Sequence, residues 1–63
     1  MFNMKVKRVI AGLTQEELAQ KAGISRAHVT RIERGSAKPS VGVAKRLATI
    51  LNVDWRNFYD DWK

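Results

Sequence analysis

The chain has 63 residues, enough for one small domain that buries about 60% of the surface its unfolded form exposes. It contains no cysteine, which excludes disulfide bonds and thiolate metal sites, and its hydrophobic content of 44% is ordinary for a globular protein. Twelve lysines and arginines against six aspartates and glutamates give a formal net charge of +6, which favours a polyanionic partner, nucleic acid first; an ordinary basic surface is the alternative.

The first predicted helix covers about residues 3–11. Val6, Val9 and Ile10 recur there at helical spacing, and Gly12 can end the helix as a C-terminal cap. No segment of the chain shows sustained alternation of apolar and polar residues, so strands are not expected. The fold class is therefore predicted to be all-α.

The second and third predicted helices are separated by a short turn at Gly23. Thr14 and Glu17 fit a capping box at the start of the second helix. The third begins at Ser25, a good N-cap, and runs to about Arg34. The residues expected to face inward are Leu18, Ala19, Ala22, Val29 and Ile32. Two helices joined in this way have the geometry of a helix-turn-helix, in which the second helix is offered to the DNA major groove.

A loop over residues 35–39 precedes the last two predicted helices. Ser40 caps a fourth helix that Asn52 ends, and its apolar stripe consists of Val43, Leu47, Ile50 and Leu51. Asp54 caps a short fifth helix that carries the aromatic residues Trp55, Phe58, Tyr59 and Trp62. The prediction is thus one domain over residues 1–63, built from five short helices with the helix-turn-helix at the second and third.

The run from Leu13 to Gly35 resembles the phage repressor and Cro-type helix-turn-helix family, often called the XRE family, and the similarity extends over about residues 6–53. Ala19 lies where the two helices cross most closely, and Gly23 lies in the turn, where a positive φ is expected. The resemblance implies a lambda-repressor-like fold and sequence-specific binding of double-stranded DNA. It also implies a bacterial or phage transcription regulator, with repression as the expected role.

The resemblance also implies which residues contact DNA. In the family, the first, second and sixth residues after the cap of the third helix touch base edges, and these are Arg26, Ala27 and Arg31 here. Arginine can pair with guanine, and alanine can pack against a thymine methyl group. His28 is a fourth candidate, with a phosphate contact or a capping role as its alternatives. The expected phosphate contacts are Gln15, Ser25, Thr30, Arg34, Ser36 and Lys38; for Ser25, capping alone would explain the residue.

Arg8 and Glu33 occupy positions at which many family members hold an arginine–glutamate pair. The resemblance therefore implies a partly buried structural ion pair between the first and third helices. The alternative is two solvent-exposed charges, which contribute little to stability.

The aromatic residues of segment 54–63 exceed what a chain of 63 residues easily buries. One interpretation is that Trp55 and Phe58 complete the core. The other is that the segment is a dimerisation tail in which Trp55, Tyr59 and Trp62 form a homodimer contact, at least on DNA, because family members commonly bind paired half-sites.

Other functions are less favoured. One histidine, no cysteine and no recognisable pair of catalytic carboxylates make an enzyme, a metal site or a cofactor unexpected. The main alternative is an interaction module whose aromatic tail binds a protein partner, such as a toxin or an antirepressor. RNA binding is weaker, because no aromatic stacking platform lies on the basic face. No apolar run approaches the ~18 residues of a membrane helix, so we expect no membrane segment and a location in the cytoplasm.

Overall fold

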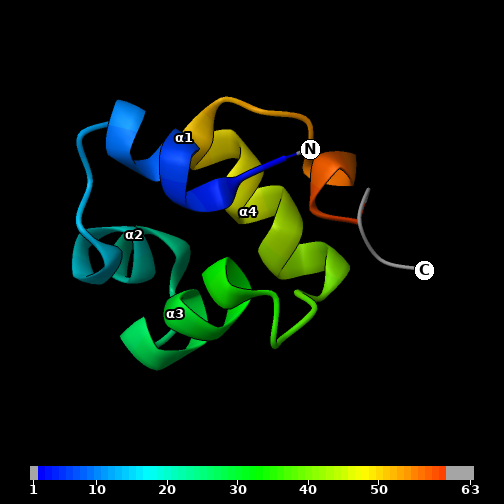
Figure 1. The fold of residues 1–63 in the computed structure, drawn as a ribbon, viewed down its shortest axis with the longest axis horizontal. Coiled ribbons are helices and arrows are strands. Elements are labelled where there is room, and N and C mark those ends of the chain that lie inside the picture. Colours follow the sequence, from blue (N-terminus) through cyan, green and yellow to red (C-terminus); the bar gives the residue numbers. More distant parts are fainter. Residues whose placement is uncertain (1, 60–63) are drawn as a thin grey trace.

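The computed structural model describes residues 2–59, which form four α-helices and one 3₁₀ helix. They are α1 (Met4–Ile10), α2 (Gln15–Ala22), α3 (Arg26–Arg34), α4 (Val41–Leu51) and η1 (Trp55–Tyr59). The described residues contain no strand, so the predicted all-helical class is confirmed. α2 packs against both α3 and α4, and η1 packs against α4. Figure 1 shows η1 beside the N-terminal end of the chain.

The prediction of five α-helices is wrong in its last element, because η1 is a 3₁₀ helix. The Asn57 N–H donates to the Asp54 carbonyl three residues back, which is the 3₁₀ pattern, and the Arg56 N–H donates to the Asp54 side chain. A segment of five residues suits this tighter helix, which is used in short pieces.

Each α-helix begins at a side chain that its own sequence supplies as a cap. Asn3, Thr14, Ser25 and Ser40 each accept a hydrogen bond from the backbone N–H three residues on. At α2 the predicted capping box is confirmed, since the Thr14 N–H also donates to the Glu17 carboxylate at 2.9 Å. This bond lowers the pKa of Glu17 below its ordinary value. The starts of the helices are therefore fixed by local sequence.

The core gathers around α2, α3 and α4. Leu18, Val29 and Leu47 are its largest fully buried side chains, and Ala19, Ala22 and Ile32 are buried with them. These inward-facing residues are the ones that the helical spacing predicts. In α4, Val43 and Leu51 are also buried, whereas Ile50 is only partly buried against the core.

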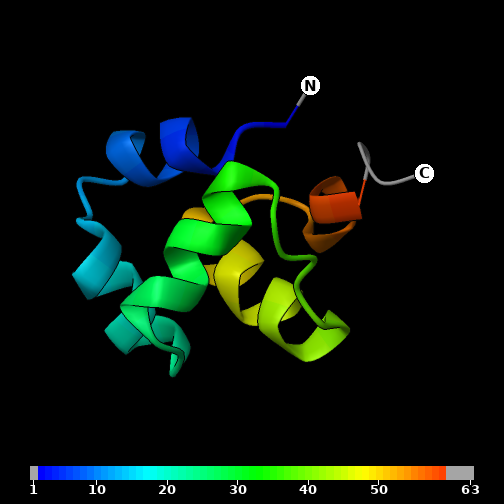
Figure 2. The ribbon, with the colours of Figure 1, turned by 60° about the horizontal axis from the view of Figure 1, so that its bottom comes forward.

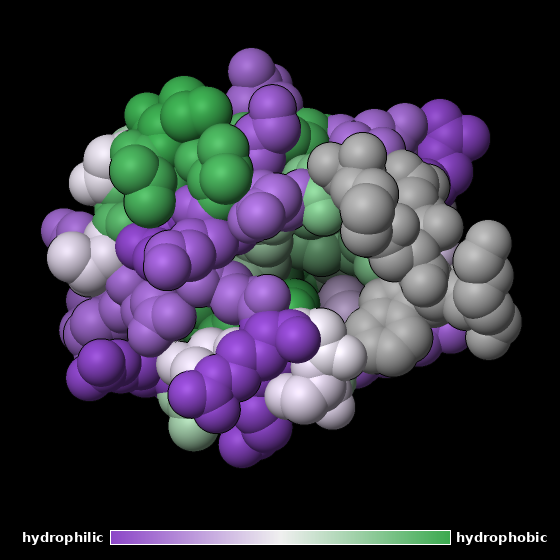
Figure 3. All heavy atoms as spheres, in the orientation of Figure 1, coloured by the Kyte–Doolittle hydropathy of each residue, from purple (hydrophilic) through white to green (hydrophobic). Residues whose placement is uncertain are grey.

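The first helix turns a different face inward from the one that its apolar spacing suggests. Val6, Val9 and Ile10 are 50%, 59% and 73% exposed, whereas Met4 and Arg8 are buried. Met4 and Arg8 are four residues apart and so share one face of α1. Met4 enters the core and Arg8 reaches a buried carboxylate, which leaves the three branched residues in solvent. Figure 3 shows the resulting apolar patch over α1.

The aromatic residues near the end of the described chain have unequal burial. Phe58 is buried and its ring lies edge-on to Phe2, with centroids 4.8 Å apart. The core role of Phe58 is therefore confirmed. Trp55 and Tyr59 are partly buried against the core, with their own centroids 6.0 Å apart. Trp62, a predicted dimer contact, lies outside the described residues.

Candidate nucleic-acid interface

A closed turn at Gly23 joins α2 to α3. Gly23 has a φ of +70°, the left-handed conformation that glycine adopts without steric cost, as the sequence predicts. The Ile24 N–H donates to the Ala19 carbonyl at 3.0 Å and completes the end of α2. Ala19 is buried, so the two helices meet closely. The turn therefore gives α3 a defined direction relative to α2, which is the geometry of a helix-turn-helix.

The two faces of α3 differ sharply. Val29 and Ile32 are buried in the core, whereas Arg26, Ala27 and Arg31 are exposed on the other side. Figure 2 shows α3 at the front of the molecule. His28 is partly buried. The four predicted base-contacting residues thus lie on one turn and a half of a helix whose inner face is fixed.

The residues expected at phosphates, apart from Gln15 at the start of α2, lie at the cap of α3, on α3 or in the loop that follows it. Ser25 and Thr30 already make hydrogen bonds within the chain: Ser25 Oγ accepts the His28 N–H at 3.0 Å, and the Thr30 hydroxyl donates to Gln15 Oε1 at 3.1 Å. The Thr30 hydroxyl also lies 3.1 Å from the Arg26 carbonyl oxygen. Arg34, Ser36 and Lys38 are exposed on the last turn of α3 and in the loop that follows. Of these, Ser36 also makes a hydrogen bond within the chain, since its hydroxyl donates to the Arg31 carbonyl at 3.2 Å.

A buried network joins α1, α2 and α3 behind this interface. Arg8 Nε donates to Glu33 Oε2 at 2.7 Å, and Gln15 Nε2 donates to Glu33 Oε1 at 3.1 Å. The Arg8 side chain is 11% exposed and that of Glu33 is 5% exposed. Arg8 Nη1 also donates to the Leu13 carbonyl at 2.7 Å. The structure therefore brings together the two charges that the family resemblance pairs, and it adds Gln15 to them.

The sequence does not predict the part that Gln15 plays in this network. The sequence predicts a phosphate contact for Gln15, but its pattern gives no sign that the Gln15 amide bridges Glu33 and Thr30. Those contacts span 18 and 15 positions of the chain and depend on how α2 crosses α3. Every buried side-chain nitrogen and oxygen among residues 2–59 has a hydrogen-bond partner, so the network is complete in the absence of DNA. The start of α2 is thereby oriented before any partner binds.

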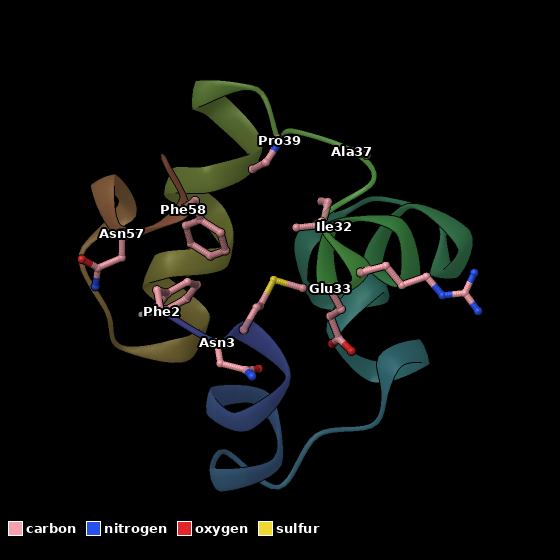
Figure 4. Close-up of a pocket in the computed structure, with 11 residues that line it drawn as sticks. Phe2, Asn3, Ile32, Glu33, Ala37, Pro39, Asn57 and Phe58 are labelled. Carbon is pink, nitrogen blue, oxygen red and sulfur yellow. The ribbon is translucent and has the colours of Figure 1, made fainter. Parts of the chain in front are cut away.

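Beside the interface is an open-sided cavity of about 350 Å³. Figure 4 shows Ala37 and Pro39 along one edge and Phe2, Asn57 and Phe58 along another. In the described part of the chain, no three His, Asp or Glu side chains are grouped closely enough to hold a metal ion. None of the helices there is long and apolar enough to cross a membrane.

Comparisons with known proteins bear on this interface. The family HTH_3, described as helix-turn-helix, matches residues 4–58. An uncharacterised HTH-type transcriptional regulator of Bacillus subtilis, YqaF, is 47% identical over 58 residues, which are 92% of this chain and 76% of that protein. Another, from Methanocaldococcus jannaschii, is 40% identical over 50 residues, which are 79% of this chain and 76% of that protein.

One solved structure is similar across nearly the whole chain. It is the crystal structure of an HTH_3 family transcriptional regulator from Vibrio cholerae, with a TM-score of 0.73 and 29% sequence identity. The match covers 94% of this chain and 33% of the Vibrio chain, so this chain spans about a third of that regulator.

Proposed function

The chain belongs to the HTH_3 helix-turn-helix family of DNA-binding transcriptional regulators. We propose that it represses transcription as a homodimer on an operator of two half-sites. A dimer with two-fold symmetry presents two recognition helices, and such helices read half-sites about one DNA turn apart. Repression follows from occupation of the operator alone, since a bound protein excludes other proteins from the same DNA.

The observation that carries this proposal is the two-sided character of α3. Its inner residues Val29 and Ile32 are buried, while Arg26, Ala27 and Arg31 are exposed. We assign Arg26 and Arg31 to guanine edges, because an arginine guanidinium makes a bidentate pair with guanine O6 and N7. Ala27 then packs against a thymine methyl group, and His28 contributes at the start of the helix.

Phosphate contacts hold this helix in register along the groove. We propose that Gln15 and the N–H groups at the start of α2 bind one phosphate, because a helix N-terminus favours an anion. Its second amide proton is available for this contact, since Glu33 accepts the other. We assign the remaining contacts to the residues at the two ends of α3 and in the loop beyond it: Ser25, Thr30, Arg34, Ser36 and Lys38.

The position of the dimer contact stays a prediction. Tyr59 and Trp55 make contacts inside the chain, to Pro39 and Lys45, which reduces the surface that they offer to a second copy. We therefore propose residues 54–63 as a dimerisation tail with Trp62 as its main apolar contact. A protein partner such as a toxin or an antirepressor would use the same tail. A cytoplasmic location follows from the proposed DNA partner.

The experiment that tests the proposal is selection of tight binders from a pool of random duplex DNA. It is done in ~150 mM salt, which suppresses purely ionic binding. We expect enrichment of an inverted repeat with half-site centres about 10 base pairs apart. If a folded sample enriches no motif, sequence-specific binding is excluded; a single unrepeated half-site excludes the dimer but leaves DNA reading intact.

Two matched variants then locate the reading surface. Arg31→Ala is expected to weaken operator binding by about ten- to a hundredfold and to relax the base preference at one position of each half-site. Arg46→Ala removes the same charge from an exposed position of α4 and serves as the control. Equal losses in the two variants, measured by fluorescence anisotropy, would show that only net charge matters.

A further inference from the structure

The loop between α3 and α4 is held in two different ways. Near α3, the N–H groups of Ser36 and Ala37 both donate to the Arg31 carbonyl, at 3.0 and 3.3 Å. Further along, Pro39 has no N–H to donate, and its carbonyl accepts the hydroxyl of Tyr59 at 2.7 Å. Tyr59 is twenty positions away and belongs to η1. Within residues 2–59, this is the one side-chain hydrogen bond that ties the loop to an element outside α3 and α4.

The inner side of the loop borders an open-sided cavity, although Pro39 itself is buried. Ala37 and Pro39 line the cavity of about 350 Å³ along one edge, and Phe58 lines it along another edge (Figure 4). The Tyr59 hydrogen bond thus holds the Pro39 carbonyl beside this cavity, and it joins this half of the loop to η1.

Tyr59 is itself held in place by its own segment. Its ring is edge-on to Trp55, with centroids 6.0 Å apart, and its neighbour Phe58 is buried against Phe2. The Lys38 ammonium lies 5.4 Å from the centre of the Tyr59 ring, within the range of a cation–π contact. One aromatic side chain thus contacts both the backbone and the charged group of the loop.

We infer that Tyr59 is a positioning residue for DNA binding. Its hydroxyl fixes Pro39 and its ring confines Lys38, so that the lysine is already ordered where it meets a DNA phosphate. Holding the loop and the lysine in place lowers the cost of this contact. Without that support the loop shifts and Lys38 no longer reaches the phosphate, so one phosphate contact is lost. This inference rests on the proposed function, since it needs the loop to contact the DNA backbone.

The test compares Tyr59→Phe with Thr49→Val in the full chain. Both remove one hydroxyl that donates to a backbone carbonyl, but Thr49 donates to Lys45 within α4 and is remote from the loop. Binding to one fixed duplex is measured by anisotropy across a range of salt concentrations, and circular dichroism verifies folding. The salt dependence counts phosphate contacts, with a slope of about −0.9 for each.

We expect Tyr59→Phe to weaken binding by about three- to tenfold and to make the salt slope shallower by about one contact. Lys38→Ala should change the slope by the same amount, and the double variant should bind no more weakly than Lys38→Ala alone. Thr49→Val should keep the slope of the unaltered chain. If the substitutions acted only through a general loss of stability, Tyr59→Phe and Thr49→Val would both lower the affinity for DNA and leave the salt slope unchanged.

The outcomes separate the two proposals. If the unaltered chain binds DNA and Tyr59→Phe keeps its affinity and slope, the role of Tyr59 is excluded while the DNA function stands. Equal effects of Tyr59→Phe and Thr49→Val, or additive effects of Tyr59→Phe and Lys38→Ala, exclude it as well. If the unaltered chain binds no duplex DNA, the proposed function fails and the role of Tyr59 fails with it.

Discussion

Two arginine–carboxylate pairs in this chain have almost the same length and very different surroundings. Arg8 and Glu33 are 2.7 Å apart behind the recognition helix, with side chains 11% and 5% exposed. Arg56 and Asp54 are 2.8 Å apart at η1, with side chains 74% and 45% exposed. Water and salt screen the second pair and hardly reach the first.

The interface and the C-terminal segment are therefore stabilised by different means. In the first region both oxygens of Glu33 are occupied, by Arg8 and Gln15, so the loss of one partner leaves a buried charge unsatisfied. In the second region η1 is attached through aromatic contacts and the Tyr59 hydroxyl, and its ion pair lies at the surface. Two ion pairs of nearly the same length therefore contribute very different amounts to the free energy of unfolding.

The largest effect is expected from breaking the buried pair. Arg8→Ala or Glu33→Ala should each lower the free energy of unfolding by about 3–5 kcal/mol, because each leaves its partner buried and unpaired. A domain of this size has roughly 3–9 kcal/mol in total, so urea unfolding is best measured in the cold.

The double variant Arg8→Ala with Glu33→Ala provides the control for this pair. Its loss should be clearly smaller than the two single losses added together, since neither charge is then left alone. Simple additivity would show that the two residues are not coupled.

A smaller effect is expected from Gln15→Leu. This change keeps the ion pair but removes the amide that serves Glu33 and Thr30, so the free energy of unfolding should fall by about 1–2 kcal/mol. Gln20, which is exposed on α2, offers the matched change Gln20→Leu as a control. Similar stabilities for the two variants in urea would mean that the Gln15 bridge contributes nothing.

Only a slight loss of stability is expected from Arg56→Ala in the same unfolding experiment, although its ion pair is almost as short as the buried one. Both side chains keep their contact with water when the pair is lost. The hydrogen bond from the Arg56 N–H to Asp54 belongs to the backbone and remains. A loss comparable to that of Glu33→Ala would overturn the comparison between the two regions.

The smallest effect is a local titration. Hydrogen bonds from the Arg56 side chain and backbone lower the pKa of Asp54 from its ordinary 3.8 to about 2. A lowered pKa in the folded state means that this group stabilises the fold above about pH 4 and that the contribution is lost as the pH falls toward 2. Carboxyl carbon NMR should show a midpoint near 2, which rises part of the way toward 3.8 in Arg56→Ala. An unshifted midpoint in the unaltered chain would contradict the pairing in solution.

Local features of the fold were predictable because nearby residues determine them. The caps at Thr14, Ser25 and Ser40 act within three positions of the chain, and the left-handed conformations of Gly23 and Asn52 follow from the residue type at a helix end. The buried faces of α2, α3 and α4 also followed from their spacing. The charged pair behind the interface was expected only through the resemblance to a family.

Features that depend on the meeting of distant segments were not predictable. The spacing of Val6, Val9 and Ile10 indicates a helix, but the face that turns inward is decided by what lies beneath it. Here that is a carboxylate for Arg8, which no local pattern reveals. The bond from Tyr59 to Pro39 has the same origin, because it joins segments twenty positions apart. Which residues meet DNA is a question for the binding experiments.

The four local caps have a consequence for how quickly the chain folds. Each α-helix carries its own start signal, and helical domains rich in local contacts fold in about microseconds to milliseconds. A ribosome adds roughly 5–20 residues per second, so one addition takes longer than the whole folding reaction. The four α-helices therefore reach their final arrangement almost as soon as they leave the ribosome. Proteolysis and aggregation then have little time to act on the unfolded chain.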